Sequence, residues 1–526
     1  MSGDRLSGDQ PRPDSAPGPE PASTPGARRC GVLLHPTALP GSPACGSFGL
    51  EAERWIEALA AKGIQVWQLL PLAPTDATGS PYSSPSAFAL NPWFLDAEQL
   101  VRDGLLQAGD LQQLPEGRRD QLDLELAPQR AEALAALLAS RQASWSAAQR
   151  ADFEAWSQAQ GPWLQDHCRF VVLKRLHGQA PWWQWPAPLA HRSRRALRAL
   201  DGEQAAALLQ EALLQWQLQR QWQRLQDLAH RLGVQLVGDV PFYVAHDSAD
   251  VWSHRRLFSV RRDGSLVTQS GVPPDYFAAT GQLWGTPVYR WLLHRLTGFR
   301  WWLRRLERQL ELVDLLRIDH FRALEAAWWV AGEADTAIEG RWHPSPGEAL
   351  LRRLRRHLHR RAVGGADVPL IAEDLGVITP EVEALRDRHG LPGMKILQFA
   401  FDGNPDNAYL PANYAGSHWV VYTGTHDNAT CIGWWNGLGE EERRRVEACV
   451  GGPVHAPGWQ LLELALASRA DLAVVPLQDL LHLGDEARFN TPGTSSGNWQ
   501  WRLQGSVADL EGPLRGLGEQ ARRYGR

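Results

Sequence analysis

Short apolar runs recur along the chain and are separated by segments with helical periodicity. The runs that predict strands lie within residues 31–34, 64–72, 234–242, 312–324, 369–380, 394–401, 418–430 and 471–481. In a run such as 312–318 almost every position is apolar, which favours a strand covered on both faces, as in a parallel sheet. Eight such strands alternating with helices predict a (β/α)8 barrel, the fold class that we expect for this chain.

Two long stretches interrupt this alternation, and we interpret them as insertions after the second and third strands. The first, about 73–230, begins with a loop rich in Gly, Ser, Pro and aromatic residues and continues with helical periodicity. The second, about 243–295, is rich in loop-forming residues, and a helix is predicted at 292–310 after it. Residues 1–28 lack apolar periodicity and predict a disordered tail, so one catalytic barrel would span 29–526.

The composition indicates which kinds of binding partner and which cellular compartment fit this chain. The net charge of −5, from 54 basic and 59 acidic residues, favours neither nucleic acid nor an anionic membrane as a partner. The basic segment 351–361 is therefore interpreted as a solvated outer helix of the barrel. Five scattered cysteines argue against a disulfide framework or a zinc site and fit the reducing cytoplasm. With neither a membrane-length apolar run nor the apolar core of a signal peptide, we expect a cytoplasmic protein.

Acidic residues follow four of the predicted strands: Asp239, Asp319, Glu373 and Asp427. The C-terminal ends of barrel strands meet at one rim, where active sites lie. Carboxylates crowded there repel one another, so one tends to stay protonated while the others are ionised, as glycosidic bond chemistry requires. A divalent metal site and a structural ion pair of Asp319 with a nearby arginine are the alternatives. Because no tight cluster of ligands is apparent, we expect no metal and no cofactor.

A series of motifs carries a resemblance to a known family. In chain order they are HPTALPG, GSPYSSPSAFALNP, GDVPFYVAHDSADVW, GVPPDYFAATGQLWGTPVYRW, LRIDHFRA, IAEDLGVITPEV, GMKILQFAF, GTHDNAT and ARFNTPGTSSGNWQWR. Together, from about residue 31 to 505, they resemble the 4-α-glucanotransferases, or amylomaltases, of glycoside hydrolase family 77. The resemblance implies retaining transfer of α-1,4-glucan segments between maltooligosaccharides or to glucose, with cyclic glucans as products of long donors.

The resemblance also assigns the catalytic roles. Asp319 corresponds to the nucleophile, Glu373 to the general acid and base, and Asp427 to the carboxylate that stabilises the transition state. Physical reasoning supports these roles, because Arg317, two residues away on the same strand face, would keep Asp319 ionised. Burial and neighbouring anions, Asp374 among them, would raise the pKa of Glu373. For Asp374 itself, a salt bridge at the rim or a helix cap is the simpler interpretation.

Sugar-binding roles are implied for further residues, each with ordinary packing as its alternative. They are Tyr82, Asp239, Asp275, Tyr276, Phe277, Gln282, Trp284, Arg317 and His426. No role is assigned to His320, Arg322, Asn498 or Trp499. An α-amylase-like hydrolase and a catalytically silent glucan-binding protein are the alternative functions, and the oligomeric state is left open between a monomer and a weak dimer.

Overall fold

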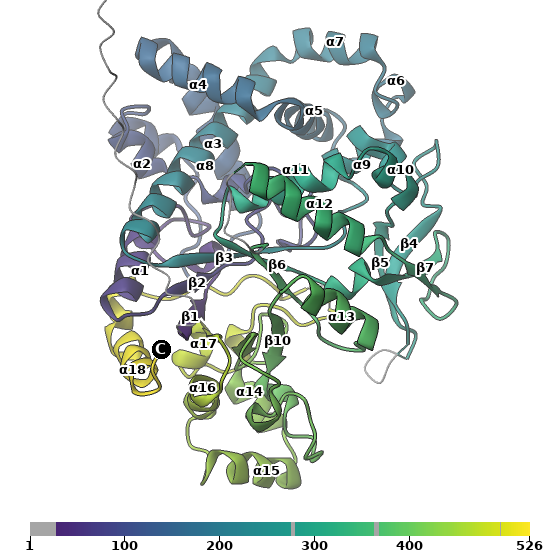
Figure 1. Cartoon of the computed structure of the whole chain (residues 1–526). Coiled ribbons are helices and arrows are strands. Elements are labelled where there is room, and N and C mark those ends of the chain that lie inside the picture. Colours follow the sequence, from purple (N-terminus) through teal and green to yellow (C-terminus); the bar gives the residue numbers. More distant parts are fainter. Residues whose placement is uncertain (1–27, 275–278, 362–367, 495) are drawn as a thin grey trace, which may run out of the picture.

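Eight parallel strands form a barrel at the centre of the molecule (Figure 1). The computed structural model describes residues 28–274, 279–361, 368–494 and 496–526. The strands follow the order β10-β11-β12-β1-β2-β3-β6-β9, and the N–H of Ala372 in β9 donates to the carbonyl of Pro392, just before β10, at 2.9 Å, which brings the two ends together. Their bounds are β1 Arg29–Leu33, β2 Val66–Gln68, β3 Gln235–Val240, β6 Leu315–Ile318, β9 Leu370–Ala372, β10 Gly393–Ile396, β11 Trp419–Tyr422 and β12 Leu472–Pro476. Each lies in or overlaps a run from which it was predicted, and the (β/α)8 fold is confirmed.

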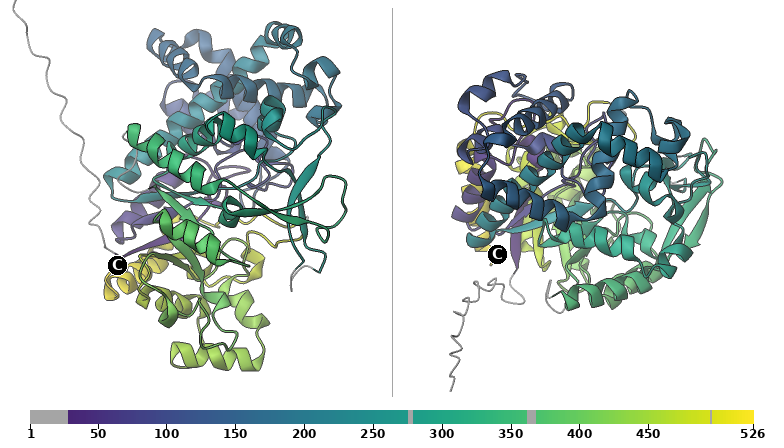
Figure 2. Two further views of the ribbon diagram at one scale, coloured as in Figure 1. Left: turned by 45° about the vertical axis from the view of Figure 1, so that its right-hand side comes forward. Right: turned by 90° about the horizontal axis from the view of Figure 1, so that it is seen from above.

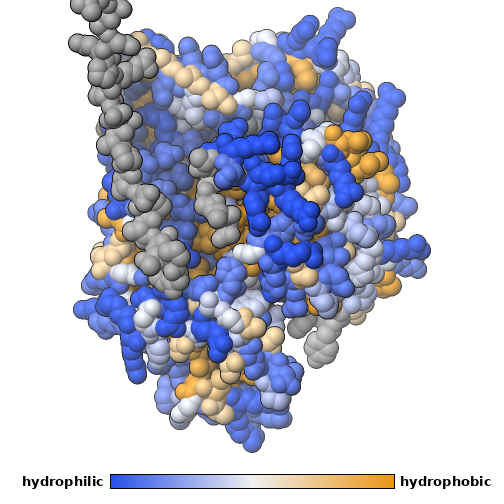
Figure 3. Space-filling model, viewed as in Figure 1, coloured by the Kyte–Doolittle hydropathy of each residue, from blue (hydrophilic) through white to orange (hydrophobic). Residues whose placement is uncertain are grey.

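The helices outside the segment between β2 and β3 lie around the barrel (Figure 1). They are α1 Leu50–Ala61, α9 Ala249–His254, α10 Trp291–Leu296, α11 Arg300–Leu310, α12 Gly347–Arg360, α13 Pro380–Arg388, α14 Cys431–Gly437, α15 Glu440–Val450, α16 Pro457–Ala467, α17 Leu477–Leu480 and α18 Glu511–Arg523. In the basic helix α12, Leu350, Leu351, Leu354 and Leu358 are buried, while most of the arginines are exposed. The surface over this helix is strongly hydrophilic (Figure 3), as the amphipathic pattern requires.

The predicted helix 292–310 is wrong in one respect, because the structure divides it into α10 and α11. Gly298 and Phe299 adopt left-handed backbone angles, with φ of 62° and 57°. A right-handed helix cannot continue through two such residues, and the chain turns there.

A group of helices between β2 and β3 lies together on one side of the barrel (Figures 1 and 2). They are α2 Ala97–Arg102, α3 Leu126–Arg141, α4 Ala147–Gln160, α5 Pro162–Leu176, α6 Ala187–Ala190, α7 Arg194–Glu203 and α8 Ala205–Arg231. The long helix α8 packs against α1, and its buried Trp222 donates an indole hydrogen bond to the carbonyl of Leu312 at 2.8 Å. This contact joins the helical group to the segment that leads into β6.

A second, antiparallel sheet was not predicted. It has the order β5-β4-β7-β8 and consists of β4 Thr268–Val272, β5 Gln282–Pro287, β7 Ala326–Ala331 and β8 Arg341–Pro344. The strands β4 and β5 contain Gly, Pro and polar residues, so their local pattern is typical of loops. They pair because β7 and β8, which follow β6, supply partners, as in the register of Gly271 with Trp328 and of Trp328 with Trp342.

Three further findings concern the N-terminal tail, the cysteines and membrane-spanning helices. The predicted tail lies outside the described residues except for Arg28, whose guanidinium donates to the carbonyl of Ser468 at 2.8 Å. All five cysteines are free thiols. Within the described ranges, no helix combines the length and apolar character needed to cross a membrane.

Candidate active site

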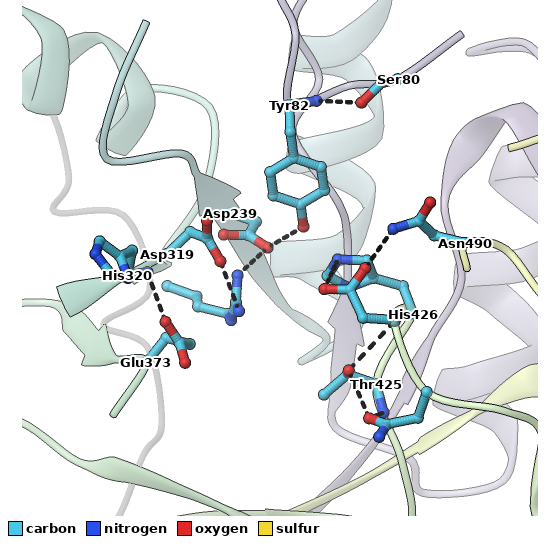
Figure 4. A network of polar contacts seen from close by, with 12 residues as sticks. Ser80, Tyr82, Asp239, Asp319, His320, Glu373, Thr425, His426 and Asn490 are labelled. Atoms are coloured by element: carbon cyan, nitrogen blue, oxygen red, sulfur yellow. Dashed lines mark hydrogen bonds and ion pairs between the residues drawn. The ribbon is translucent and has the colours of Figure 1, made fainter. Parts of the chain in front are cut away.

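The C-terminal ends of β3, β6 and β9 and the loop after β11 bring four carboxyl groups to one rim of the barrel (Figure 4). Asp239 lies within β3, Asp319 and Glu373 directly follow β6 and β9, and Asp427 follows β11 by five residues. Parallel pairing of β3 with β6 and of β6 with β9 sets these ends side by side. The sequence therefore predicted correctly that these acidic residues would meet.

Arg317 is the cation that two of these carboxylates share. Its Nη1 donates to Oδ2 of Asp239 at 2.6 Å, and its Nη2 lies 2.9 Å from Oδ1 of Asp319. Arg317 is buried, and in the register it stands directly opposite Asp239. Burial opposes the charge of Arg317, but the two carboxylates raise its pKa well above the ordinary value, so it stays a cation.

Glu373 has a different environment, because its carboxyl group is held by two neutral donors. The N–H of His320 donates to Oε2 at 2.6 Å, and the N–H of Leu375 donates to Oε1 at 3.0 Å. Burial, and next the charge of Asp319, raise the pKa of Glu373 to about 8. Glu373 is therefore protonated at pH 7.

The sequence predicts that Asp374 helps to raise the pKa of Glu373, and this prediction is wrong. Asp374 forms a salt bridge with Arg386 of α13 and accepts the N–H of Met394 at 2.8 Å. Its charge is compensated outside the site, whereas Asp319 is the anion that acts on Glu373. The simpler interpretation of Asp374 as a rim salt bridge is thus confirmed.

Asp319 experiences opposing influences. On balance its pKa is raised: burial is the largest cause, Arg317 opposes the increase without cancelling it, and the charges of Asp239 and Asp427 add to it. The pairing of Arg317 with Asp319 follows the sequence prediction, but its second partner, Asp239, was not predicted. Since the cation contacts Asp319 while Glu373 contacts only neutral N–H groups, the proton of this pair belongs on Glu373 and the negative charge on Asp319.

Asp427 contacts His426 and Asn490, which lie together away from Glu373 in Figure 4, and it stays ionised for another reason. Burial would raise its pKa, but His426, with Nε2 at 3.2 Å from Oδ2, and Asn490, whose Nδ2 donates to Oδ1 at 2.6 Å, hold the pKa below its usual range. Asn490 was missed as a site residue, although it stands in the motif ARFN. Nothing in that motif indicates which distant carboxylate its side chain reaches.

Tyr82 connects the two sides of the site. Its hydroxyl donates to Oδ2 of Asp239 at 2.7 Å, and its ring stacks on His426 with centroids 5.1 Å apart. Trp499 packs against both rings, at 5.8 Å from Tyr82 and 5.9 Å from His426. One face of Tyr82 is therefore occupied by His426, so any sugar that stacks on Tyr82 must use the remaining exposed part of the ring.

A small cavity of about 20 Å³ lies beside Asp239, and Tyr82 and Tyr243 are among the residues that line it. The second oxygen of Asp239, Oδ1, is buried and has no hydrogen-bond partner among the described residues. The described residues contain no group of three or more His, Cys, Asp or Glu side chains arranged to hold a metal ion. The unpartnered Oδ1 of Asp239 can accept a hydrogen bond from a hydroxyl-bearing ligand.

The antiparallel sheet reaches the site through Trp284 of β5. Its ring lies edge-on to His320 with centroids 4.8 Å apart, and its Nε1 donates to Oε1 of Gln282 at 3.2 Å. Gln282 and Trp284 are exposed and so remain available to a ligand. The other residues expected in this region, Asp275, Tyr276 and Phe277, lie outside the described residues.

Several known proteins resemble this chain over most of its length. The family model described as 4-alpha-glucanotransferase matches residues 34–508. The 4-alpha-glucanotransferase of Thermus thermophilus is 43% identical over 94% of this chain and 99% of its own, and that of Synechocystis is 42% identical over 90% and 94%. The structure of the Streptococcus agalactiae amylomaltase in complex with acarbose superimposes with a TM-score of 0.89 at 32% identity, covering 95% of this chain and 99% of that one.

Proposed function

The chain belongs to the 4-alpha-glucanotransferase family, glycoside hydrolase family 77, and from this premise we propose that it transfers α-1,4-glucan segments through a covalent intermediate on Asp319. The donor is a maltooligosaccharide, and the acceptor is another maltooligosaccharide or glucose. The contrast between Asp319, beside a guanidinium, and Glu373, held by two N–H groups, is the observation that carries this mechanism. It supports one ionised and one protonated carboxyl group at pH 7, the pair that a retaining enzyme needs.

In the first step an oxygen of Asp319 attacks the anomeric carbon of the donor. The glycosidic C–O bond breaks, its electron pair goes to the leaving 4-oxygen, and Glu373 gives that oxygen its proton. In the second step the ionised Glu373 takes the proton from the 4-hydroxyl of the acceptor, whose oxygen attacks the same carbon. The bond to Asp319 breaks and restores its carboxylate, and two inversions leave the α configuration.

The remaining residues bind the sugar ring in this proposal. Asp427, which stays ionised, binds hydroxyls of the attacked ring and stabilises the positive charge that develops there. His426, Tyr82 and Asp239 line the same position, and Arg317 maintains the charge of Asp319.

Transfer exceeds hydrolysis if the acceptor displaces water from the intermediate. Trp284 and Gln282, exposed beside His320, are proposed to bind the acceptor and to exclude solvent. The predicted contributions of Asp275, Tyr276 and Phe277 belong to the same region of the chain. With a long donor, attack by its own far end yields a cyclic glucan.

Incubation with maltotriose tests the reaction. Transfer releases glucose and forms longer maltooligosaccharides while the number of reducing ends stays constant, whereas an α-amylase-like hydrolase raises that number and forms no longer products. Asp319→Asn is expected to abolish both activities without lowering the melting temperature. The control is Asp374→Asn, which removes a carboxylate that is paired with Arg386 outside the site. Full activity of Asp319→Asn would contradict the mechanism.

A further inference from the structure

Arg322 is a buried arginine with an unusual environment. It lies in the short 3-10 helix Phe321–Leu324 that follows Asp319, and 7% of its surface is exposed. No carboxylate of the described residues forms a salt bridge with it, and its Nε has no hydrogen-bond partner there. Burial lowers the pKa of Arg322, with only Glu325 opposing the shift. Burying a cation without a paired anion costs free energy. We therefore expect Arg322 to have a role other than stabilising the fold.

The contacts that Arg322 does make join two segments that the chain separates widely. Its guanidinium carbon lies over the indole of Trp342 in β8, 3.6 Å from the ring centroid. Its Nη1 donates to the carbonyl of Val377 at 2.7 Å. The planar guanidinium can stack and donate at the same time, which an ammonium group cannot do.

The carbonyl that accepts this hydrogen bond belongs to residues 375–378, a segment that begins two residues after Glu373. Within it, Val377 is 67% exposed and Gly376 has a left-handed φ of 83°. Among the described residues, the bond from Arg322 is the only hydrogen bond that joins residues 375–378 to another strand or helix. The first residue of this segment, Leu375, donates its N–H to Oε1 of Glu373.

We propose that Arg322 is a positioning residue: by lying on Trp342 and donating to the carbonyl of Val377, it holds the segment whose Leu375 N–H orients the carboxyl group of Glu373. This inference rests on the proposed role of Glu373 as acid and base. The N–H of His320, the residue after Asp319, holds the other oxygen, so each oxygen of the carboxyl group accepts one N–H. Arg322 therefore acts through geometry and does not touch the substrate.

The chemistry of the leaving group separates this role from a merely structural one. When maltotriose is the donor, the leaving sugar oxygen needs the proton of Glu373. When α-maltosyl fluoride is the donor, the C–F bond breaks and fluoride leaves with its electron pair without needing a proton. A misplaced Glu373 therefore lowers kcat/KM for maltotriose and spares kcat/KM for the fluoride, because this ratio reports the steps up to formation of the intermediate.

The experiment compares both donors over a range of pH. Arg322→Met is expected to lower kcat/KM for maltotriose about tenfold, mainly through kcat, and that for the fluoride by about twofold or less, since general acid catalysis contributes ~10²–10⁴-fold in all. The N–H of Leu375 lowers the pKa of Glu373, so its loss should move the basic limb near pH 8 to higher pH. Arg322→Lys, which retains a charge and a donor, should recover part of the loss.

Matched controls exclude a general loss of stability. Arg526 is also 7% exposed, and among the described residues it donates only to backbone carbonyls, those of Arg29, Ala465, Leu466 and Ser468. Arg526→Met should therefore lower the melting temperature and leave the ratio of kcat/KM between the two donors unchanged. Val377→Ala retains the accepting carbonyl and should leave kcat/KM unchanged for both donors. Trp342, which is 37% exposed, can be replaced with little risk to folding, and Trp342→Ala should lower the maltotriose value selectively.

Each outcome decides the matter. Equal losses for both donors, or no loss, in Arg322→Met overturn the inference, and if that variant does not fold, Trp342→Ala decides by the same criterion. Glu373→Gln must itself separate the two donors. If it does not, the proposed function fails, whereas separation by Glu373→Gln without separation by the Arg322 and Trp342 variants rejects only the positioning role.

Discussion

Replacing Asp319 by asparagine should lower the pKa of Glu373. Burial is the larger cause that raises this pKa to about 8, and the negative charge of Asp319 is the next. Asparagine has nearly the same shape but no charge, so burial remains and the repulsion disappears. The same loss of charge occurs when Asp319 forms the covalent intermediate, and the change would convert Glu373 from an acid into a base at the moment when the acceptor must lose a proton.

The size of the effect follows from Coulomb's law. At the ~5.5 Å separation of carboxyl groups in a retaining enzyme and an effective dielectric constant of about 20, two unit charges interact by about 3 kcal/mol, or about two pH units. Arg317, which contacts Asp319 at 2.9 Å in the native site, keeps its own charge and acts in the same direction. In Asp319→Asn, the pKa of Glu373 should therefore be about 6.

The measurement is a titration of glutamate labelled with ¹³C at the side-chain carboxyl carbon. The signal of Glu373 is identified by its absence in Glu373→Gln. Asp374→Asn is the matched control, because Asp374 is the adjacent acidic residue and its charge is already paired with Arg386. An unchanged or higher pKa in Asp319→Asn, or an equal decrease in Asp374→Asn, would refute the electrostatic reasoning.

Three further outcomes are expected. The folded-state pKa of Glu373, about 8, exceeds the ordinary 4.5, so the native protein loses stability as pH rises between these values. Glu373→Gln should therefore be more stable by about 4 kcal/mol at pH 8 and equally stable at pH 4 in urea unfolding, and a gain at pH 4 would argue against this linkage. Asn490→Ala removes a donor that holds the carboxylate of Asp427 in place, so kcat/KM for maltotriose should fall about tenfold; an unchanged kcat/KM would show that Asn490 does not position Asp427. Tyr82→Phe leaves the buried Asp239 with one donor fewer, and its free energy of unfolding should fall by about 1–2 kcal/mol; no decrease in urea unfolding would contradict the importance of that hydrogen bond.

The barrel could be predicted because its signal is local. A strand that is covered on both faces must be apolar at nearly every position, and residues 312–318 or 471–476 show this without reference to the rest of the chain. The antiparallel sheet could not be predicted in this way, because Thr268–Val272 and Gln282–Pro287 pair through partners supplied by a distant segment. The break at Gly298 and Phe299 was missed for a related reason, since the apolar pattern continues across it.

For the candidate site, the sequence by itself determined which acidic residues follow the strands, and in a parallel barrel those ends must share one rim. Only the tertiary structure decided which partner each carboxylate has. Arg317 is divided between Asp239 and Asp319, Asp374 is paired with Arg386, and Asn490 reaches Asp427 across 63 residues of chain. The physical reason is that hydrogen bonds and charge interactions act over a few ångströms in space, whatever the separation along the chain, while the hydrophobic pattern that specifies a strand is written in consecutive residues.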